Sequence, residues 1–348
     1  MSWRCPEIQP VASGMDAEIQ DCLNQKTKPF GSLGRIEELA MQLARLQQSL
    51  TPKIEQPLHL VFAADHGVVA EGVSPFPQQV TAQMVNNFCQ GGAAINVFCR
   101  QLGWQMRVIN AGVAFPLAQE QHPMLVNQPV APGTANLLRQ AAMSSEQCLQ
   151  ALALGQSQVE QGLAQGSNCF SFGEMGIGNT TSSAAMIAAL LGLSGEQVAG
   201  AGTGLSLDGQ LHKAHVINQS LARFSERTAL AVLRQVGGYE IAAMVGAMLA
   251  AAQADALVLV DGVIAQAAAL CAIRLAPAAQ ERMLFAHAGR EPGIQQVLHH
   301  LQAKALLDLN LALGEGSGAV LALPMLQCSA AMLREMASFS QAGVSDAS

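Results

Sequence analysis

From about Leu58 onward, short apolar runs alternate with longer amphipathic or alanine-rich segments. The short runs predict β-strands at residues 58–64, 106–110, 169–173, 256–260 and 283–286. The longer segments predict helices at residues 77–88, 93–101, 145–165, 182–191, 238–252 and 263–273. Such alternation is typical of an α/β protein whose mostly parallel sheet is flanked by helices.

The two ends of the chain have a different pattern. Apolar residues at Ile36, Leu39, Leu43 and Leu46 follow three- and four-residue steps, which predict an amphipathic helix. A shorter helix is expected near residues 17–23, and residues 318–338 again have a helical pattern, followed by a frayed tail at 340–348. We therefore expect a small helical domain built from residues 1–50 and 325–348, beside a large α/β catalytic domain at 51–324.

Composition narrows the class of protein. Of the 348 residues, half are hydrophobic and 12% are charged, so the chain can bury a large core. A net charge of -7 without a long basic cluster argues against a nucleic-acid partner. The first residues lack a secretory signal, and the longest apolar run, residues 241–252, is too short to cross a bilayer. We expect a cytoplasmic protein with no membrane partner.

Cysteines and histidines give no sign of a metal site. The eight cysteines are scattered without C-x-x-C spacing, which favours buried thiols. His212, His215, His299 and His300 have no carboxylate or cysteine companions at ligand spacing. Neither a metal nor a cofactor is expected.

Polar residues follow four of the predicted strands directly. They are Asp65, Glu174, Asp261 and His287. The carboxyl ends of parallel strands line one crevice, so these side chains should converge there. Any single one could be an ordinary polar residue at the start of a loop, but four together favour a binding site.

Two glycine-rich stretches could hold an anion. Gly176 and Gly178 precede Asn179 and Thr180 in a segment that predicts a helix start, where free N–H groups bind phosphate. The segment matches neither dinucleotide nor P-loop glycine patterns, and a turn with a capping box is the alternative. Downstream, residues 202–213 begin with Gly202 and Thr203 and end in Lys213, a possible point charge for a phosphate.

Several motifs together resemble one enzyme family. They are TKPFGSLGRIEELA, ADHGVVAEGVSPFPQQVTAQMV, GGAAINVF, GEMGIGNTT, VDGVIAQAAAL and LGEGSGAVLALP, spread over residues 27–324. In order, spacing and length they resemble the nicotinate-nucleotide:dimethylbenzimidazole phosphoribosyltransferases of cobalamin lower-ligand synthesis. The resemblance implies a Rossmann-like large domain, a small helical domain from both termini, a homodimer and no metal.

The resemblance also implies a reaction and its residues. Nicotinate mononucleotide and 5,6-dimethylbenzimidazole would give α-ribazole 5′-phosphate and nicotinate, with inversion at the ribose C1′. Glu315, between Gly314 and Gly316, matches the family's general base, which takes the imidazole proton during attack. Glu174 matches a second carboxylate, which would stabilise positive charge developing on the ribose.

The remaining site residues follow from the same alignment of motifs. The base pocket would comprise Phe76, Pro77, Gln83, Met84, Met175 and Leu313. The phosphate, ribose and nicotinate would contact Gly176, Gly178, Asn179, Thr180, Gly202, Thr203, Lys213, Asp261, His287, Gly289 and Arg290. Asp65 and His66 would form part of the walls of the binding site, or would only stabilise the turn after the first predicted strand.

Four positions depart from the family pattern. Phe76 and Met84 replace polar residues, which makes the base pocket more apolar and leaves the acceptor base open. Ala312 and Gly289 replace an arginine and a serine, so Arg290 could supply part of the phosphate contact. These departures keep one alternative open, a nucleotide-binding or sensing protein with reduced catalysis. A nucleotide-dependent oxidoreductase is disfavoured because no dinucleotide glycine fingerprint follows the first strand.

Overall fold

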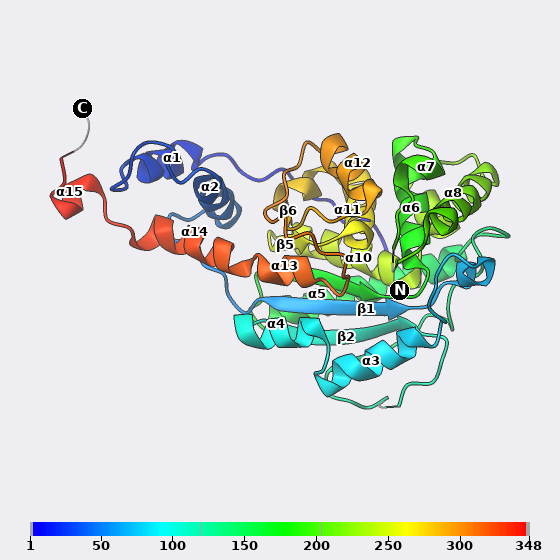
Figure 1. Ribbon diagram of the computed structural model, residues 1–348. Coiled ribbons are helices and arrows are strands. Elements are labelled where there is room, and N and C mark those ends of the chain that lie inside the picture. The colour runs from blue at the N-terminus through cyan, green and yellow to red at the C-terminus, as the bar shows by residue number, and fades with distance from the viewer. Residues whose placement is uncertain (1–2, 119, 203, 346–348) are drawn as a thin grey trace.

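A single parallel sheet organises the chain in the computed structural model, which describes residues 3–118, 120–202 and 204–345 (Figure 1). Its six strands are β1 (Leu58–Ala64), β2 (Gln105–Gly112), β3 (Leu125–Asn127), β4 (Cys169–Met175), β5 (Leu257–Val260) and β6 (Met283–Phe285). They lie in the order β3-β2-β1-β4-β5-β6. The order reverses between β1 and β4, which is where open α/β sheets form their ligand crevice.

The α/β prediction is confirmed, with one strand missed. All five predicted strands are present, and β1 has the predicted bounds. β3 was not predicted because three residues, Leu125–Asn127, are too short to show an apolar run. Every pairing in the sheet is parallel.

Helices cover both faces of the sheet. The six predicted helices are α3 (Val80–Gln90), α4 (Ala94–Leu102), α5 (Ser145–Ala164), α6 (Asn179–Leu191), α10 (Tyr239–Gln253) and α11 (Val263–Leu275). Alternate residues of β1 enter two different cores: Leu60 and Phe62 pack on the α5, α10 side, and Val61 and Ala63 on the α3, α4 side. This alternation explains why β1 reads as a continuous apolar run.

Four further helices lie where no helix was expected. They are α7 (Gly195–Val198), α8 (Leu207–Ala222), α9 (Ala229–Val236) and α12 (Pro292–His300). In α8, polar residues such as His212 and Lys213 interrupt the apolar stripe, so its periodicity is weak. Two 3-10 segments, η1 (Gly67–Glu71) and η2 (Pro277–Arg282), complete the sheet region.

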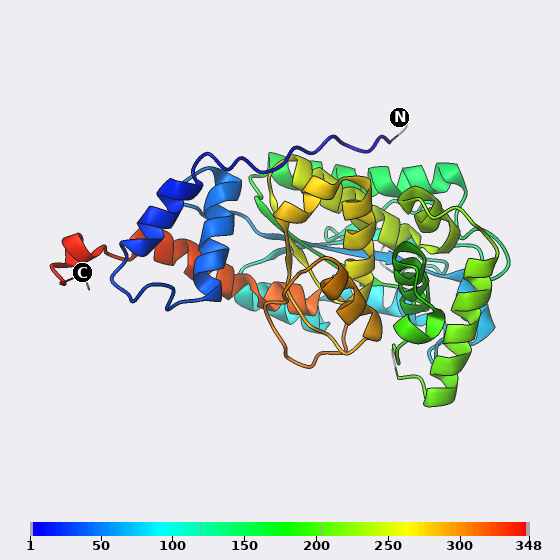
Figure 2. The same ribbon diagram turned by 90° about the horizontal axis from the view of Figure 1, so that it is seen from above.

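Helices from both termini lie beside the sheet (Figure 2). α1 (Asp16–Asn24), α2 (Arg35–Gln47) and the end of α14 (Leu323–Glu335) share a small apolar core that includes Ile19, Leu23 and Leu333. The start of α14, with Leu323 and Leu326, packs instead on the core of the sheet. We propose that this cluster forms the small helical domain, with α14 continuing from one domain into the other.

The end of the chain differs from the predicted frayed tail in one respect. Phe339–Ala342 forms a short helix, α15, because Ser338 caps it by accepting the backbone N–H of Gln341. Residues 346–348 lie outside the described chain. Within the residues that the structure describes, no helix is long and apolar enough to cross a membrane.

Candidate active site

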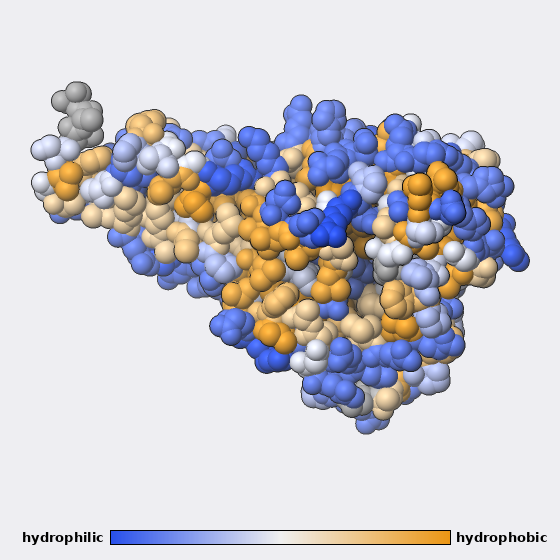
Figure 3. Space-filling view, viewed as in Figure 1, coloured by the Kyte–Doolittle hydropathy of each residue, from blue (hydrophilic) through white to orange (hydrophobic). Residues whose placement is uncertain are grey.

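A cavity of about 370 Å³ opens beside the carboxyl ends of β4 and β5. Four of its walls are the end of β4 with the start of α6, the junction of β5 and α11, the loop after β6, and residues 311–315 before α13 (Ser317–Leu321). Residues 73–84, which lead into α3, together with Ala201, Gly202 and the α8 residue Lys213, complete the lining. Apolar residues gather over the middle of this face of the molecule, near α13 (Figure 3). The sheet topology therefore brings together motifs that are far apart in the sequence.

Glu315 lies at the apolar end of the cavity with only 6% of its surface exposed. Its φ of +68° is left-handed, and Gly316 follows at +86°. Oε2 accepts the backbone N–H of Ile95 at 3.2 Å. Burial raises the pKa of the Glu315 carboxyl, and the Ile95 hydrogen bond opposes that rise.

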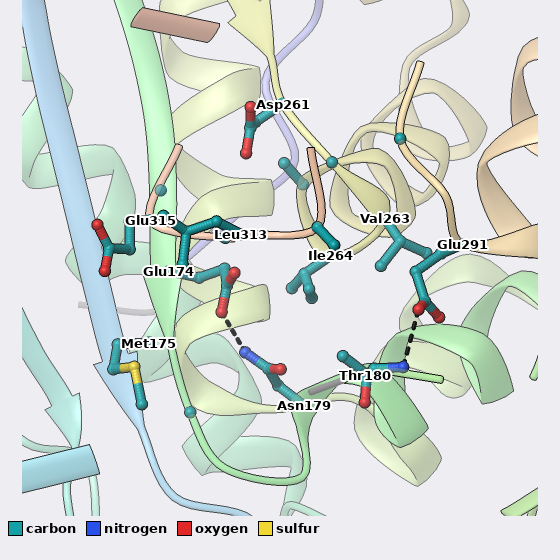
Figure 4. A pocket seen from close by; sticks show the side chains of 18 of the residues that line it. Glu174, Met175, Asn179, Thr180, Asp261, Val263, Ile264, Glu291, Leu313 and Glu315 are labelled. Carbon is teal, nitrogen blue, oxygen red and sulfur yellow. Dashed lines mark hydrogen bonds between the residues drawn. The ribbon is translucent and has the colours of Figure 1, made fainter. Parts of the chain in front are cut away.

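Glu174, near the end of β4, is the second carboxyl in the cavity. It extends toward Asn179, whose side-chain amide donates to Oε2, while Glu315 lies on the Met175 side of β4 (Figure 4). Burial raises the pKa of Glu174 to about 8; the Asn179 hydrogen bond opposes the shift and nearby carboxylates add to it. Burial therefore favours a protonated Glu174 at neutral pH.

Lys213, on α8, is fully buried at another wall of the cavity. Its ammonium group donates to Thr180 Oγ1 at 2.9 Å and to the Gly200 carbonyl at 3.3 Å. Burial lowers the pKa of Lys213 to about 8, and the charge of Glu291 partly offsets this shift. A buried cation beside the start of α6 is suited to an anionic group.

Glu291 is a cavity residue that the sequence analysis missed. Its Oε1 accepts the backbone N–H of Gly202 at 2.8 Å, which ties the loop after α7 to the start of α12. Pro292 at the first turn of α12 marks Glu291 as a helix N-cap, but nothing in the sequence places this carboxylate near Lys213. Several other missed wall residues are apolar, among them Val73, Val80, Ile177, Ile264 and Ile294.

Asp261 and His287 hold the loop that carries Glu315. Oδ1 of Asp261 accepts the backbone N–H of Ala319 at 2.9 Å. Burial raises the pKa of Asp261 to about 6, while backbone hydrogen bonds from Gly262 and from the start of α13 lower it. Nε2 of His287 lies 3.4 Å from the backbone nitrogens of Leu309 and Leu311. Both side chains line the cavity and also tie its rim to the sheet.

The turn after β1 lies behind the wall rather than in it. Asp65 accepts the backbone N–H of Ala114 at 2.8 Å. The buried His66 ring contacts Glu240 at 2.5 Å and Ser182 at 2.9 Å. Neither Asp65 nor His66 lines the cavity, so these contacts fit the interpretation in which the pair serves the turn.

Most of the predicted site residues line this one cavity. They are Glu315, Glu174, Phe76, Met84, Met175, Leu313, Gly176, Gly178, Asn179, Thr180, Gly202, Lys213, Asp261, His287, Gly289 and Arg290. Pro77 and Gln83 are exposed and do not line it. Thr203 lies outside the described residues. Arg290 is exposed, and its Nε donates to Asn310 Oδ1 at 2.5 Å, so this arginine is already paired.

The arrangement separates two chemical environments. At the apolar end of the cavity the Glu315 carboxylate lies near Met175 and Leu313, which suits a flat heterocycle (Figure 4). The other combines Lys213 with the backbone at the start of α6, which suits a phosphate. In the described part of the chain, no group of three or more His, Cys, Asp or Glu side chains is placed to hold a metal ion.

Comparisons with known proteins agree with this description. A family model described as "Phosphoribosyltransferase" matches residues 8–344. A nicotinate-nucleotide–dimethylbenzimidazole phosphoribosyltransferase of Pseudomonas aeruginosa is 49% identical, covering 99% of this chain and 98% of its own. A protein of the same name from Dechloromonas aromatica is 48% identical, with 98% of each chain covered. The crystal structure of CobT from Thermus thermophilus superposes with a TM-score of 0.92 at 43% identity, covering 95% of this chain and 99% of that one.

Proposed function

The chain belongs to the nicotinate-nucleotide–dimethylbenzimidazole phosphoribosyltransferase family, and on this premise we propose that it uses Glu315 as the general base of that reaction. The enzyme transfers the phosphoribosyl group of nicotinate mononucleotide to 5,6-dimethylbenzimidazole or a related base. The products are α-ribazole 5′-phosphate and nicotinate, and the reaction belongs to cobalamin lower-ligand synthesis. The alternative of a binding protein with reduced catalysis has no support from the relatives.

The observation that carries the assignment is the environment of the Glu315 carboxyl. One of its oxygens is held by the Ile95 N–H, and the group borders the apolar end of the cavity. Burial raises its pKa and therefore its basicity. Glu315 would take the N–H proton of the acceptor while the opposite ring nitrogen attacks C1′. General-base assistance is typically worth about 10²–10⁴-fold in rate.

The leaving group needs no proton. Nicotinate in the donor is a cationic pyridinium, and it departs with the electrons of the C1′–N bond as a neutral ring. Positive charge then develops on the ribose, on the side where we place Glu174. A donor that is itself cationic would favour the ionised form of Glu174 over the protonated form that burial favours.

We assign the donor phosphate to the end of the cavity that holds Lys213. Gly176, Gly178 and Thr180 supply backbone and hydroxyl contacts there, at the start of α6. Gly289 and Ala312 offer no side-chain donors, so the buried ammonium is the main cation for this group. Arg290 would add to it only by leaving Asn310.

We assign the acceptor to the apolar side, between Phe76, Met84, Met175 and Leu313. The Phe76 ring and the two thioethers can pack against the faces of a benzimidazole. A homodimer and a cytoplasmic location complete the proposal. The resemblance to the family supports the homodimer, and the cytoplasmic location is expected from the sequence.

Nicotinate release tests the function. The purified protein should release nicotinate from nicotinate mononucleotide only when an aromatic base is added, with α-ribazole 5′-phosphate formed in equal amount. Chromatography of both products across a panel of bases, 5,6-dimethylbenzimidazole included, measures this. Tight binding of both ligands without product would refute the proposal.

A further inference from the structure

A buried histidine outside the cavity contacts the backbone of Glu315. His59, on β1, is fully buried and does not line the cavity. We propose that His59 is a positioning residue for the reaction: its Nε2–H holds the left-handed backbone of Glu315, and Ser171 fixes the tautomer that makes this possible. This inference rests on the proposed role of Glu315 as the base.

The hydrogen bonds define the protonation of the ring. Nε2 of His59 lies 2.9 Å from the Glu315 carbonyl oxygen, and Nδ1 lies 2.6 Å from Ser171 Oγ. A carbonyl can only accept, so Nε2 carries the proton, and in a neutral ring Nδ1 accepts the hydroxyl proton of Ser171. Burial lowers the pKa of His59 to about 4, which keeps the ring neutral at physiological pH.

The sheet places the two side chains together. His59 and Ser171 are directly paired across neighbouring strands β1 and β4, so their side chains point to the same face. Both are completely buried. The Trp104 ring meets His59 edge to face at 6.4 Å, and its Nε1 donates to the Val320 carbonyl at 3.2 Å. Two ring donors therefore hold the two ends of the segment from Glu315 to Val320.

The Glu315 backbone needs such support because its conformation is rarely adopted by residues other than glycine. Glu315 has a φ of +68°. The loop also lies directly on β4: a Cβ at Gly173 would be 2.0 Å from the Glu315 carbonyl oxygen, and a Cβ at Gly316 would be 2.3 Å from His59 Cε1. The ring and the strand thus fix the position of this peptide.

The backbone conformation of Glu315 determines the direction in which its carboxylate points. In this orientation Oε2 meets the Ile95 N–H and the side chain borders the acceptor end of the cavity. Without the His59 bond, the peptide could rotate out of the left-handed region and carry the carboxylate away. Proton transfer depends on the alignment of acceptor and base, so the loss should fall on kcat rather than on ligand binding.

Two substitutions of His59 separate the hydrogen bond from the packing. His59→Phe keeps a ring against Trp104 but has no donor, and His59→Gln retains an N–H at the reach of Nε2. We expect His59→Phe to lower kcat about 10-fold or more, with the Kd of both substrates changed less than about threefold, and His59→Gln to recover most of the rate. Unchanged kcat in folded His59→Phe would overturn the proposal.

A double substitution distinguishes positioning from a general structural defect. In a Glu315→Gln background His59→Phe should have almost no further effect on turnover, because the group it positions has already lost its function. An equal fractional loss in both backgrounds would refute the proposal. If Glu315→Gln alone keeps full turnover, the base assignment fails, and this inference with it. If only His59→Phe is without effect, this inference fails alone.

Should His59→Phe fail to fold, Ser171→Ala gives a second test. It removes only the hydroxyl that donates to Nδ1, so the ring can exchange tautomers and lose its bond to Glu315. We expect a smaller decrease in kcat, about two- to tenfold, with unchanged substrate affinity. A Ser171→Ala protein with wild-type kcat would contradict the role of Ser171.

Discussion

Ile95 donates its backbone N–H to Oε2 of Glu315 across 3.2 Å, although the two residues are 220 positions apart in the sequence. Ile95 lies in the first turn of α4, so the carboxylate meets the positive end of a helix. This contact holds one oxygen and stabilises the anion that accepts a proton. In the described chain, Oε1 has no hydrogen-bond partner and remains available to a substrate.

Burial of Glu174 predicts a stability that depends on pH. The folded-state pKa of Glu174, about 8, lies above the ordinary value of 4.5. Its contribution to the free energy of unfolding is therefore fully present below about pH 4.5 and is lost as the pH rises toward 8. Glu174→Gln removes that loss. The stability of the variant relative to wild type should therefore increase by about 1 kcal/mol or more from pH 5 to pH 8. Urea unfolding at both pH values measures it; an equal difference at both would contradict the assignment.

Lys213 predicts that donor affinity decreases in alkaline solution. Because burial lowers its pKa to about 8, the ammonium group loses its charge as the pH rises through that value. The Kd of nicotinate mononucleotide should rise, and Lys213→Met should weaken binding about 10-fold or more at pH 7. Calorimetric titration of both proteins from pH 6.5 to 9 measures this. A Lys213→Met protein with wild-type affinity would exclude the lysine from the phosphate site.

Phe76 is predicted to affect the acceptor alone. The ring lines the cavity while 45% of its surface is exposed, so a bound base would cover an apolar surface that Phe76→Ala removes. We expect the KM for 5,6-dimethylbenzimidazole to rise about 10-fold and the KM for nicotinate mononucleotide to stay constant. Val97→Ala, at 47% exposure and outside the cavity walls, is the matched control. Equal effects on both KM values would contradict the assignment.

Gly173 is predicted to tolerate no side chain. A Cβ at this position would lie 2.0 Å from the Glu315 carbonyl oxygen, a backbone atom that cannot move without the loop. Gly173→Ala should lower kcat at least about 10-fold and reduce the free energy of unfolding by about 1–3 kcal/mol. Gly14→Ala, where nothing lies within 4 Å, should change neither. Steady-state kinetics and urea unfolding of both variants check this; wild-type kcat in Gly173→Ala would show that the loop adapts.

The sequence predicts the strands and helices of this protein better than it predicts the contacts inside the site. Strands such as Leu58–Ala64 are buried on both faces and therefore appear as continuous apolar runs. Glu174 at the end of β4 and the polar residues after β5 and β6 meet in one cavity because parallel strands end at the same edge. β3 and α8 were missed because one is too short and the other lacks a clear apolar stripe.

The missed contacts in the site have a common cause. The donor to Glu315 is the backbone N–H of Ile95, and a backbone group has no signature in a residue pattern. Glu291 and His59 come from segments whose sequence context is that of a helix start and a buried strand. Asp261 lines the cavity, but its hydrogen bond to the Ala319 backbone depends on a loop geometry that only the fold defines.

Glu315→Gln tests the central claim most directly. Glutamine keeps an oxygen that can accept the Ile95 N–H but cannot take a proton, so the geometry survives and the base is lost. Turnover of the variant should be measured as nicotinate release at saturating concentrations of both substrates, with the Kd of each determined separately. We predict kcat lower by about 10²–10⁴-fold with both Kd values nearly unchanged. Full turnover with both ligands bound would contradict the account.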